Sequence, residues 1–130
     1  MRVIDSSALI KYFTRETGWE RVRDLMLDGV MTVDLAIKEV ANALWRKIIR
    51  GEVDYNIVLT IMRTLLEEAI PIIDQRKYVI RALELAVKYR ITVYDAIFIV
   101  LALEQNMELI TSDDAQADVA GKVGVRVILV

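Results

Sequence analysis

Four acidic residues of this chain follow sequence patterns that would bring their side chains together: Asp5, Glu39, Asp95 and Asp113. Asp5 and Asp113 each come just after a short apolar run of the kind typical of a buried parallel strand. Asp95 falls in the first turn of a predicted helix, and Glu39 lies about one turn into another. Ligands of open α/β sheets bind at the carboxyl ends of the strands, where the strand order reverses. We therefore expect the four carboxylates to line one pocket.

A pocket of four carboxylates requires a counter-charge. Two carboxylates about 4 Å apart repel each other by roughly 4 kcal/mol at an effective dielectric constant of about 20, so four would not all stay ionised without protons or a cation. Oxygen ligands suit Mg²⁺ and Mn²⁺, and such a metal activates water or binds a phosphate oxygen. The pattern predicts metal-dependent phosphodiester hydrolysis at this pocket.

Each acid also has a purely structural interpretation. Asp95 stands three residues after Thr92 in a capping-box arrangement, and Asp113 or Asp114 is a natural cap for a following helix. Glu39 fits a solvated helix face, and Asp5, at a strand end, is the hardest to explain without a function. These interpretations account for each acid alone. They do not explain why all four occupy positions from which they reach one pocket.

The elements that would position the acids alternate between strand and helix. Apolar runs predict strands at residues 2–4, 30–33, 69–74, 108–111 and 125–130, with Pro71 favouring an edge position. Helical spacing predicts helices at 8–13 (capped by Ser6 or Ser7), from 19 until Gly29, at 35–50 (capped by Asp34), 54–68, 78–89, 92–103 and 114–120. Residues 96–103 are apolar on every side, so this helix is predicted to be buried on every side. The alternation predicts an α/β three-layer sandwich, a mainly parallel twisted sheet flanked by helices, in a single domain of residues 1–130.

Composition narrows the chemistry further. The chain has 130 residues, 55% of them hydrophobic, and it contains no His and no Cys. Ser-His-Asp and Cys-His mechanisms are therefore excluded, and the composition argues against a zinc site. Without cysteine, a secretory signal or an apolar run of about 20 residues, the sequence predicts a cytoplasmic protein with no membrane segment. A net charge of −2 gives no global basic field for nucleic acid.

Four segments, in this order, resemble the PIN domain, and within it the VapC toxins of type II toxin–antitoxin systems: Val3-Ile4-Asp5-Ser6-Ser7-Ala8-Leu9, Glu39-Val40-Ala41-Asn42-Ala43-Leu44, Tyr94-Asp95-Ala96 and Leu109-Ile110-Thr111-Ser112-Asp113. The resemblance implies a Mg²⁺- or Mn²⁺-dependent endoribonuclease that hydrolyses RNA. The acidic cluster of the family maps onto Asp5, Glu39, Asp95 and Asp113, with Asp5 and Asp95 binding the metal most directly. Asp113 is preferred to Asp114 because it matches the Thr-x-Asp spacing. The hydroxyls of Ser6, Ser7 and Thr111 would orient the carboxylates.

The resemblance also implies partners, namely a VapB-like antitoxin and a second copy of the chain in a homodimer. RNA phosphates would be held by basic residues around the pocket, for which the candidates are Lys11, Arg15, Lys38, Arg46 and Lys47. Two alternatives stay open at this point. One is a PIN nuclease that is not a toxin and acts in RNA maturation, and the other is a PIN-fold binding module that does not cut.

Overall fold

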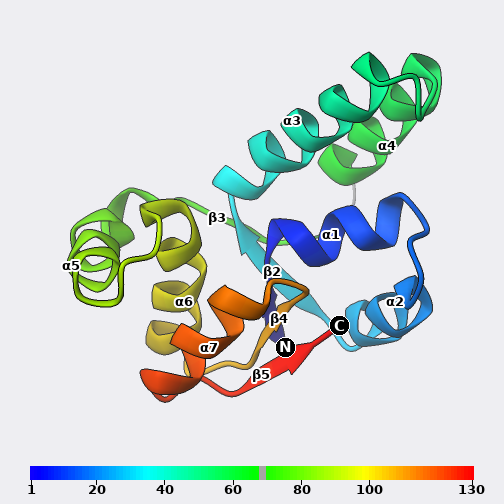
Figure 1. Cartoon of the computed structure of the whole chain (residues 1–130). Coiled ribbons are helices and arrows are strands. Elements are labelled where there is room, and N and C mark those ends of the chain that lie inside the picture. The colour runs from blue at the N-terminus through cyan, green and yellow to red at the C-terminus, as the bar shows by residue number, and fades with distance from the viewer. Residues whose placement is uncertain (68–69) are drawn as a thin grey trace.

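The computed structural model describes residues 1–67 and 70–130 (Figure 1). The strands are β1 Arg2–Ile4, β2 Val30–Val33, β3 Ile72–Ile73, β4 Leu109–Thr111 and β5 Val127–Leu129. The helices are α1 Ser6–Phe13, α2 Trp19–Leu27, α3 Leu35–Ile49, α4 Tyr55–Glu67, the short 3-10 helix η1 Arg76–Tyr78, α5 Val79–Tyr89, α6 Val93–Gln105 and α7 Asp114–Lys122. The predicted helix end at Glu68 and strand start at Ala69 lie outside the described residues.

The five strands form one parallel sheet in the order β3-β2-β1-β4-β5. The chain moves outward from β1 to β2 and β3, then returns to place β4 on the other side of β1. The strand order therefore reverses between β1 and β4, where Val3 pairs with Leu109. Because Asp5 and Asp113 follow these two strands, the topology itself brings them to the same edge of the sheet.

Helices cover both faces of the sheet, which confirms the predicted three-layer α/β sandwich. In Figure 1, α1 to α4 lie on one side of the strands and α5 to α7 on the other. This division follows from the right-handed crossovers of parallel strands, since the direction of strand addition changes after β3. Helix α6 packs against β1, β2 and β4, and every residue from 96 to 102 is buried. The prediction of a helix buried on every side is confirmed for these residues, whereas Leu103 is half-buried.

The start of α1 differs from the prediction. Neither Ser6 nor Ser7 is the cap, because the helix already begins at Ser6 and Asp5 is its N-cap. The Asp5 carboxylate accepts a hydrogen bond from the Ala8 backbone N–H at 2.9 Å. An aspartate satisfies this amide of the first helical turn as well as a serine does, and its selection leaves both serine hydroxyls available to other partners.

Two further boundaries differ from the prediction. Asp34 precedes α3 but makes no side-chain capping bond, because its Oδ1 accepts from the Gln75 backbone N–H at 3.1 Å instead. Within the described residues 70–74 of the predicted strand, only Ile72–Ile73 forms one. Its edge position is confirmed, since β3 pairs only with β2 and Pro71 uses its carbonyl to accept from Thr32 N–H at 3.1 Å. None of the described helices is long and apolar enough to span a bilayer.

Candidate active site

The four predicted acids line a single hollow of about 250 Å³ at the carboxyl edge of the sheet. Asp5 comes from the end of β1, Glu39 from α3, Asp95 from the first turn of α6 and Asp113 from the turn after β4. The other lining residues are Ser6, Ser7, Ile10, Asn42, Ala43, Arg46 and Gln116. Asp114 is exposed and does not line the hollow. The expected convergence of the four acids therefore occurs, and Asp113 rather than Asp114 takes part in it.

Asp5 is the most deeply buried of the four, with 2% of its surface exposed. Its carboxylate accepts hydrogen bonds from the Ala8 backbone N–H at 2.9 Å, the Ser7 hydroxyl at 2.7 Å and the Thr111 hydroxyl. Burial raises the pKa of Asp5 to about 6, and the negative charge of Asp113 raises it too, against the lowering effect of the hydrogen bonds. The capping bond and the two hydroxyls fix the carboxylate, so its orientation is set before any ligand binds.

Glu39 and Asp95 are half-buried on two sides of the same hollow. Glu39 Oε1 accepts from the Ser6 hydroxyl at 2.9 Å. Burial raises the pKa of Glu39, and the charge of Asp95 raises it further. Burial likewise raises the pKa of Asp95, with a second contribution from the charge of Asp113. At the start of α6, the Thr92 hydroxyl accepts a hydrogen bond from the Asp95 backbone N–H at 3.1 Å. The backbone of Asp95 therefore takes part in the helix cap, as the capping interpretation predicted, while Asp95 also lines the hollow.

Gln116 was not singled out from the sequence, yet it forms hydrogen bonds with three residues of the site: Asp95, Thr111 and Asp113. It is 1% exposed. Its Nε2 donates to the Asp95 carbonyl at 3.0 Å, and its Oε1 accepts from the Thr111 hydroxyl at 3.1 Å. Its backbone N–H donates to Asp113 Oδ1 at 3.0 Å, which makes Asp113 the N-cap of α7. An Asp followed three residues later by Gln is a variant of the capping box, and this spacing is the signal that marks the residue in the sequence.

We expect Gln116→Leu to lower the free energy of unfolding by about 1–3 kcal/mol, because the Asp95 carbonyl and the Thr111 hydroxyl would each lose the hydrogen bond that the buried Gln116 side chain makes. The substitution keeps an apolar side chain of similar size in the space, so the loss reports the hydrogen bonds. Urea unfolding measures it. The exposed Gln105→Ala is the matched control and should stay within about 0.5 kcal/mol of the parent. Equal stability of both variants would contradict the bridging role.

Basic residues surround the hollow less completely than predicted. Of the five candidates, Arg46 lines it, and Lys11, Arg15, Lys38 and Lys47 do not. Arg15 instead stacks over the Trp19 ring, with its guanidinium carbon 3.8 Å from the ring centroid. The ammonium of Lys47 pairs with Glu52 at 3.7 Å. These two cations have local partners that the sequence pattern does not reveal.

The donor set suits a hard divalent cation. In residues 1–67 and 70–130, no group of three or more His, Cys, Asp or Glu side chains is arranged so that it could hold a metal ion. Mg²⁺ commonly takes one or two carboxylates and keeps several waters. None of the four acids is in a salt bridge within this part of the chain. Three of them have raised pKa values. The negative charge of the cluster is thus not paired in a salt bridge within the described residues, and Arg46 is the cation that lines the same hollow.

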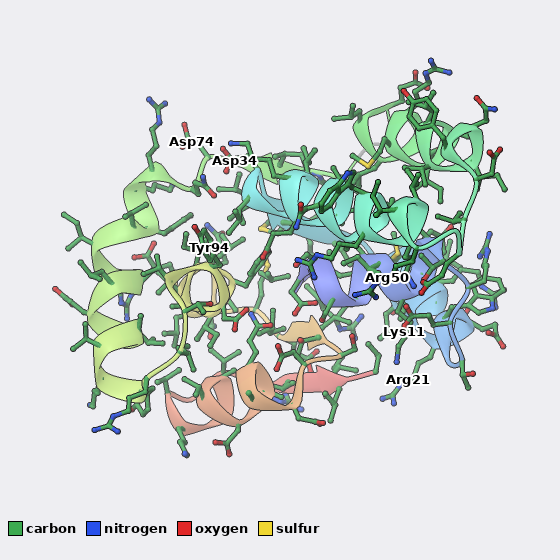
Figure 2. The ribbon with its side chains drawn as sticks, turned by 45° about the horizontal axis from the view of Figure 1, so that its top comes forward. Lys11, Arg21, Asp34, Arg50, Asp74 and Tyr94 are labelled. Carbon is green, nitrogen blue, oxygen red and sulfur yellow. The ribbon has the colours of Figure 1, made fainter. Side chains whose placement is uncertain are left out.

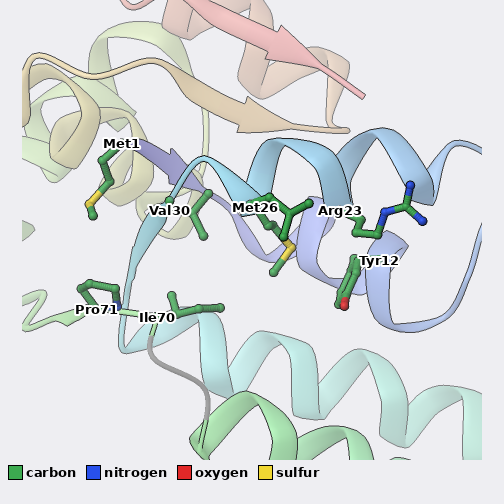
Figure 3. A pocket seen from close by; sticks show the side chains of 9 residues that line it. Met1, Tyr12, Arg23, Met26, Val30, Ile70 and Pro71 are labelled. Carbon is green, nitrogen blue, oxygen red and sulfur yellow. The ribbon is translucent and has the colours of Figure 1, made fainter.

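A larger hollow of about 420 Å³ lies at the opposite edge of the sheet (Figure 3). Met1, Val30 and Pro71 contribute to it from the amino ends of three strands, and Tyr12 and Met26 close its other side. None of the described residues that line it is acidic. The chemistry described above therefore belongs to the smaller hollow.

Comparisons with known proteins place these features in a family. The family model of the PIN domain matches residues 2–122. Ribonuclease VapC3 of Pyrobaculum aerophilum is 30% identical to this chain in an alignment of 120 residues that covers 89% of this chain and 92% of the relative.

Solved structures share the fold. PAE2754 from Pyrobaculum aerophilum has a TM-score of 0.76 at 23% identity, over 97% of this chain and 82% of the other. A toxin–antitoxin complex from Klebsiella pneumoniae has a TM-score of 0.62 at 19% identity, and FitAcB from Neisseria gonorrhoeae has 0.63 at 15%. Each of these two covers 98% of this chain and 96% of the other.

Proposed function

This chain belongs to the PIN domain family, and from that premise we propose that it is a VapC-type endoribonuclease that cleaves RNA with a bound Mg²⁺ or Mn²⁺. The observation that carries the proposal is the hollow at the strand-order reversal, where four carboxylates from four separate elements meet and none has a salt-bridge partner in the described part of the chain. A purely structural role explains one or two buried acids, but the repulsion among four is a cost that a ligand must offset.

Asp5 and Asp95 would hold the metal most directly, and Glu39 and Asp113 would complete the site directly or through water. When bound, the metal supplies an activated water and neutralises charge on the phosphate. The chain contributes orientation: Ser7, Ala8 and Thr111 fix the Asp5 carboxylate, and Gln116 fixes the start of α7. Glu39 Oε1 is bonded to the Ser6 hydroxyl, which leaves Oε2 to accept the proton of the attacking water, a task that its raised pKa favours.

We propose a VapB-like antitoxin as the partner of this chain and a homodimer as its assembly. Support for the antitoxin comes from Ribonuclease VapC3 as a relative and from a structural neighbour that is a toxin–antitoxin complex. A partner that neutralises the acids would also relieve the repulsion described above. Copurification with the product of an adjacent small gene tests the first proposal, and light scattering of the purified chain tests the second.

The central test is cleavage of end-labelled single-stranded RNA by the purified chain, free of antitoxin. We expect cleavage with Mg²⁺ or Mn²⁺, loss of cleavage in excess chelator, and recovery when the metal is restored. Cleavage that continues in chelator after dialysis would contradict the metal-dependent mechanism. No cleavage of any RNA by the folded chain with either metal would favour a PIN-fold binding module.

A further inference from the structure

We propose that Arg46 of α3 and Arg50, the residue that directly follows α3, form together with Lys11 of α1 the track that holds the RNA strand beside the acids. The arginines bind phosphates next to the phosphate at which the strand is cut. This inference rests on the proposed nuclease function and adds to it the direction in which the strand leaves the site. It arises from a stripe on α3 that runs out of the acid cluster.

The stripe on α3 is continuous with the site. Residues three, four and seven apart share one face of a helix, so Glu39, Asn42, Arg46 and Arg50 lie in line. Glu39, Asn42 and Arg46 all line the hollow. At a rise of about 1.5 Å per residue, Arg46 stands about 10 Å from Glu39 along the helix axis, and Arg50 one turn beyond. The polarity of the stripe therefore changes from acidic at the site to basic at its outer end.

Helix α1 supplies the opposite wall. Ser7 and Ile10 line the hollow, and Lys11 lies one turn beyond Ser7 on the same face. Helices α1 and α3 pack against each other. Figure 2 shows Lys11 and Arg50 on the same side of the molecule, with Arg21 of α2 beyond them. Ile10 of α1 and Ala43 of α3 add apolar side chains to the lining of the hollow.

The charges on this stripe are free to act on a ligand. Within residues 1–67 and 70–130, neither arginine is in a salt bridge, and nor is Lys11. The chain as a whole carries a net charge of −2, so RNA gains no general attraction from it. A polyanion approaching four carboxylates needs local cations, and guanidinium groups bind phosphate with paired hydrogen bonds. This stripe is where the structure offers them next to the acids.

The test measures RNA binding rather than cleavage. A fluorescent single-stranded RNA is titrated with protein in the Asp95→Asn background at several KCl concentrations. Each phosphate contact contributes about 0.7 to the slope of log K against log[salt] for a single strand. We expect Arg46→Gln to make the slope shallower by about 0.7, and the Arg46→Gln/Arg50→Gln pair by about 1.4. The control is Arg126→Gln, an exposed arginine just before β5 and thus at the opposite edge of the sheet, which should leave the slope unchanged.

Kinetics of the active protein provide a second measurement. If Arg46 only positions RNA, Arg46→Gln raises KM several-fold and leaves kcat within about threefold of the parent. An unchanged salt slope in a folded Arg46→Gln protein would overturn the proposed track. That result would also be obtained if Arg46 served only as a counter-charge for the acids, and it would equally overturn the track. Because the parent protein is assayed for cleavage in parallel, failure of the track is distinguishable from failure of the nuclease function.

Discussion

The Asp95→Asn variant is expected to lose RNA cleavage by roughly 10³-fold, the scale on which removing one preorganised electrostatic group slows an enzyme. The amide has nearly the shape of the carboxylate, so the fold should persist. Loss of the charge also removes the repulsion between Asp95 and Asp113 that helps to raise the pKa of Asp95. Cleavage of labelled RNA in saturating Mg²⁺ measures the effect, and circular dichroism confirms that the variant is folded.

The matched control is Thr92→Ala, because it separates capping from chemistry at the same helix start. Thr92 is exposed and its hydroxyl accepts from the Asp95 backbone N–H. Its loss should cost about 1 kcal/mol of stability and leave cleavage near the parent level. If Asp95→Asn instead unfolds the protein while Thr92→Ala removes cleavage, the helix start matters only as a cap and the assignment of Asp95 to the site is wrong.

The Asp5→Asn variant is expected to be more stable than the parent at neutral pH in the absence of divalent metal, by up to about 3 kcal/mol. The pKa of Asp5 is raised from 3.8 to about 6, mainly by burial, and one pKa unit corresponds to about 1.4 kcal/mol. Between these two values the folded chain binds more protons than the unfolded chain. The free energy of unfolding therefore falls as pH rises through this window, and Glu39 and Asp95, whose pKa values are also raised, act in the same direction.

Urea unfolding at pH 4 and pH 7.5, both with chelator, measures the Asp5 effect. The advantage of Asp5→Asn should be small at pH 4, where Asp5 is protonated in the parent, and largest at pH 7.5. Asp114→Asn, exposed and outside the hollow, is the control and should show little pH-dependent difference. Destabilisation of Asp5→Asn by the same amount at both pH values would mean that Asp5 acts only as the cap of α1. The Asp5→Asn variant should therefore gain stability and at the same time lose RNA cleavage.

The sequence by itself determined the features that depend on local pattern. Strand and helix periods read from short windows located β1, β2, β4 and α6, and the apolar character of residues 96–102 predicted their complete burial correctly. The order of acids after strand ends and at helix starts predicted one pocket, because parallel strands of a sheet all end at the same edge. These conclusions needed no knowledge of which strands are neighbours.

Only the tertiary structure decided which polar groups pair within that pocket. Thr111 bonds to Asp5 across 106 residues of sequence, and Gln116 reaches back to Asp95 across 21, so no local window contains both partners. The tertiary structure also decided that Asp5, rather than a serine, caps α1. It placed Arg46 beside the acids, whereas Arg15 stacks on Trp19. The physical reason is that helix and strand periods are set by the backbone, whereas each side-chain hydrogen bond or ion pair depends on which partner the packing of distant elements brings within reach.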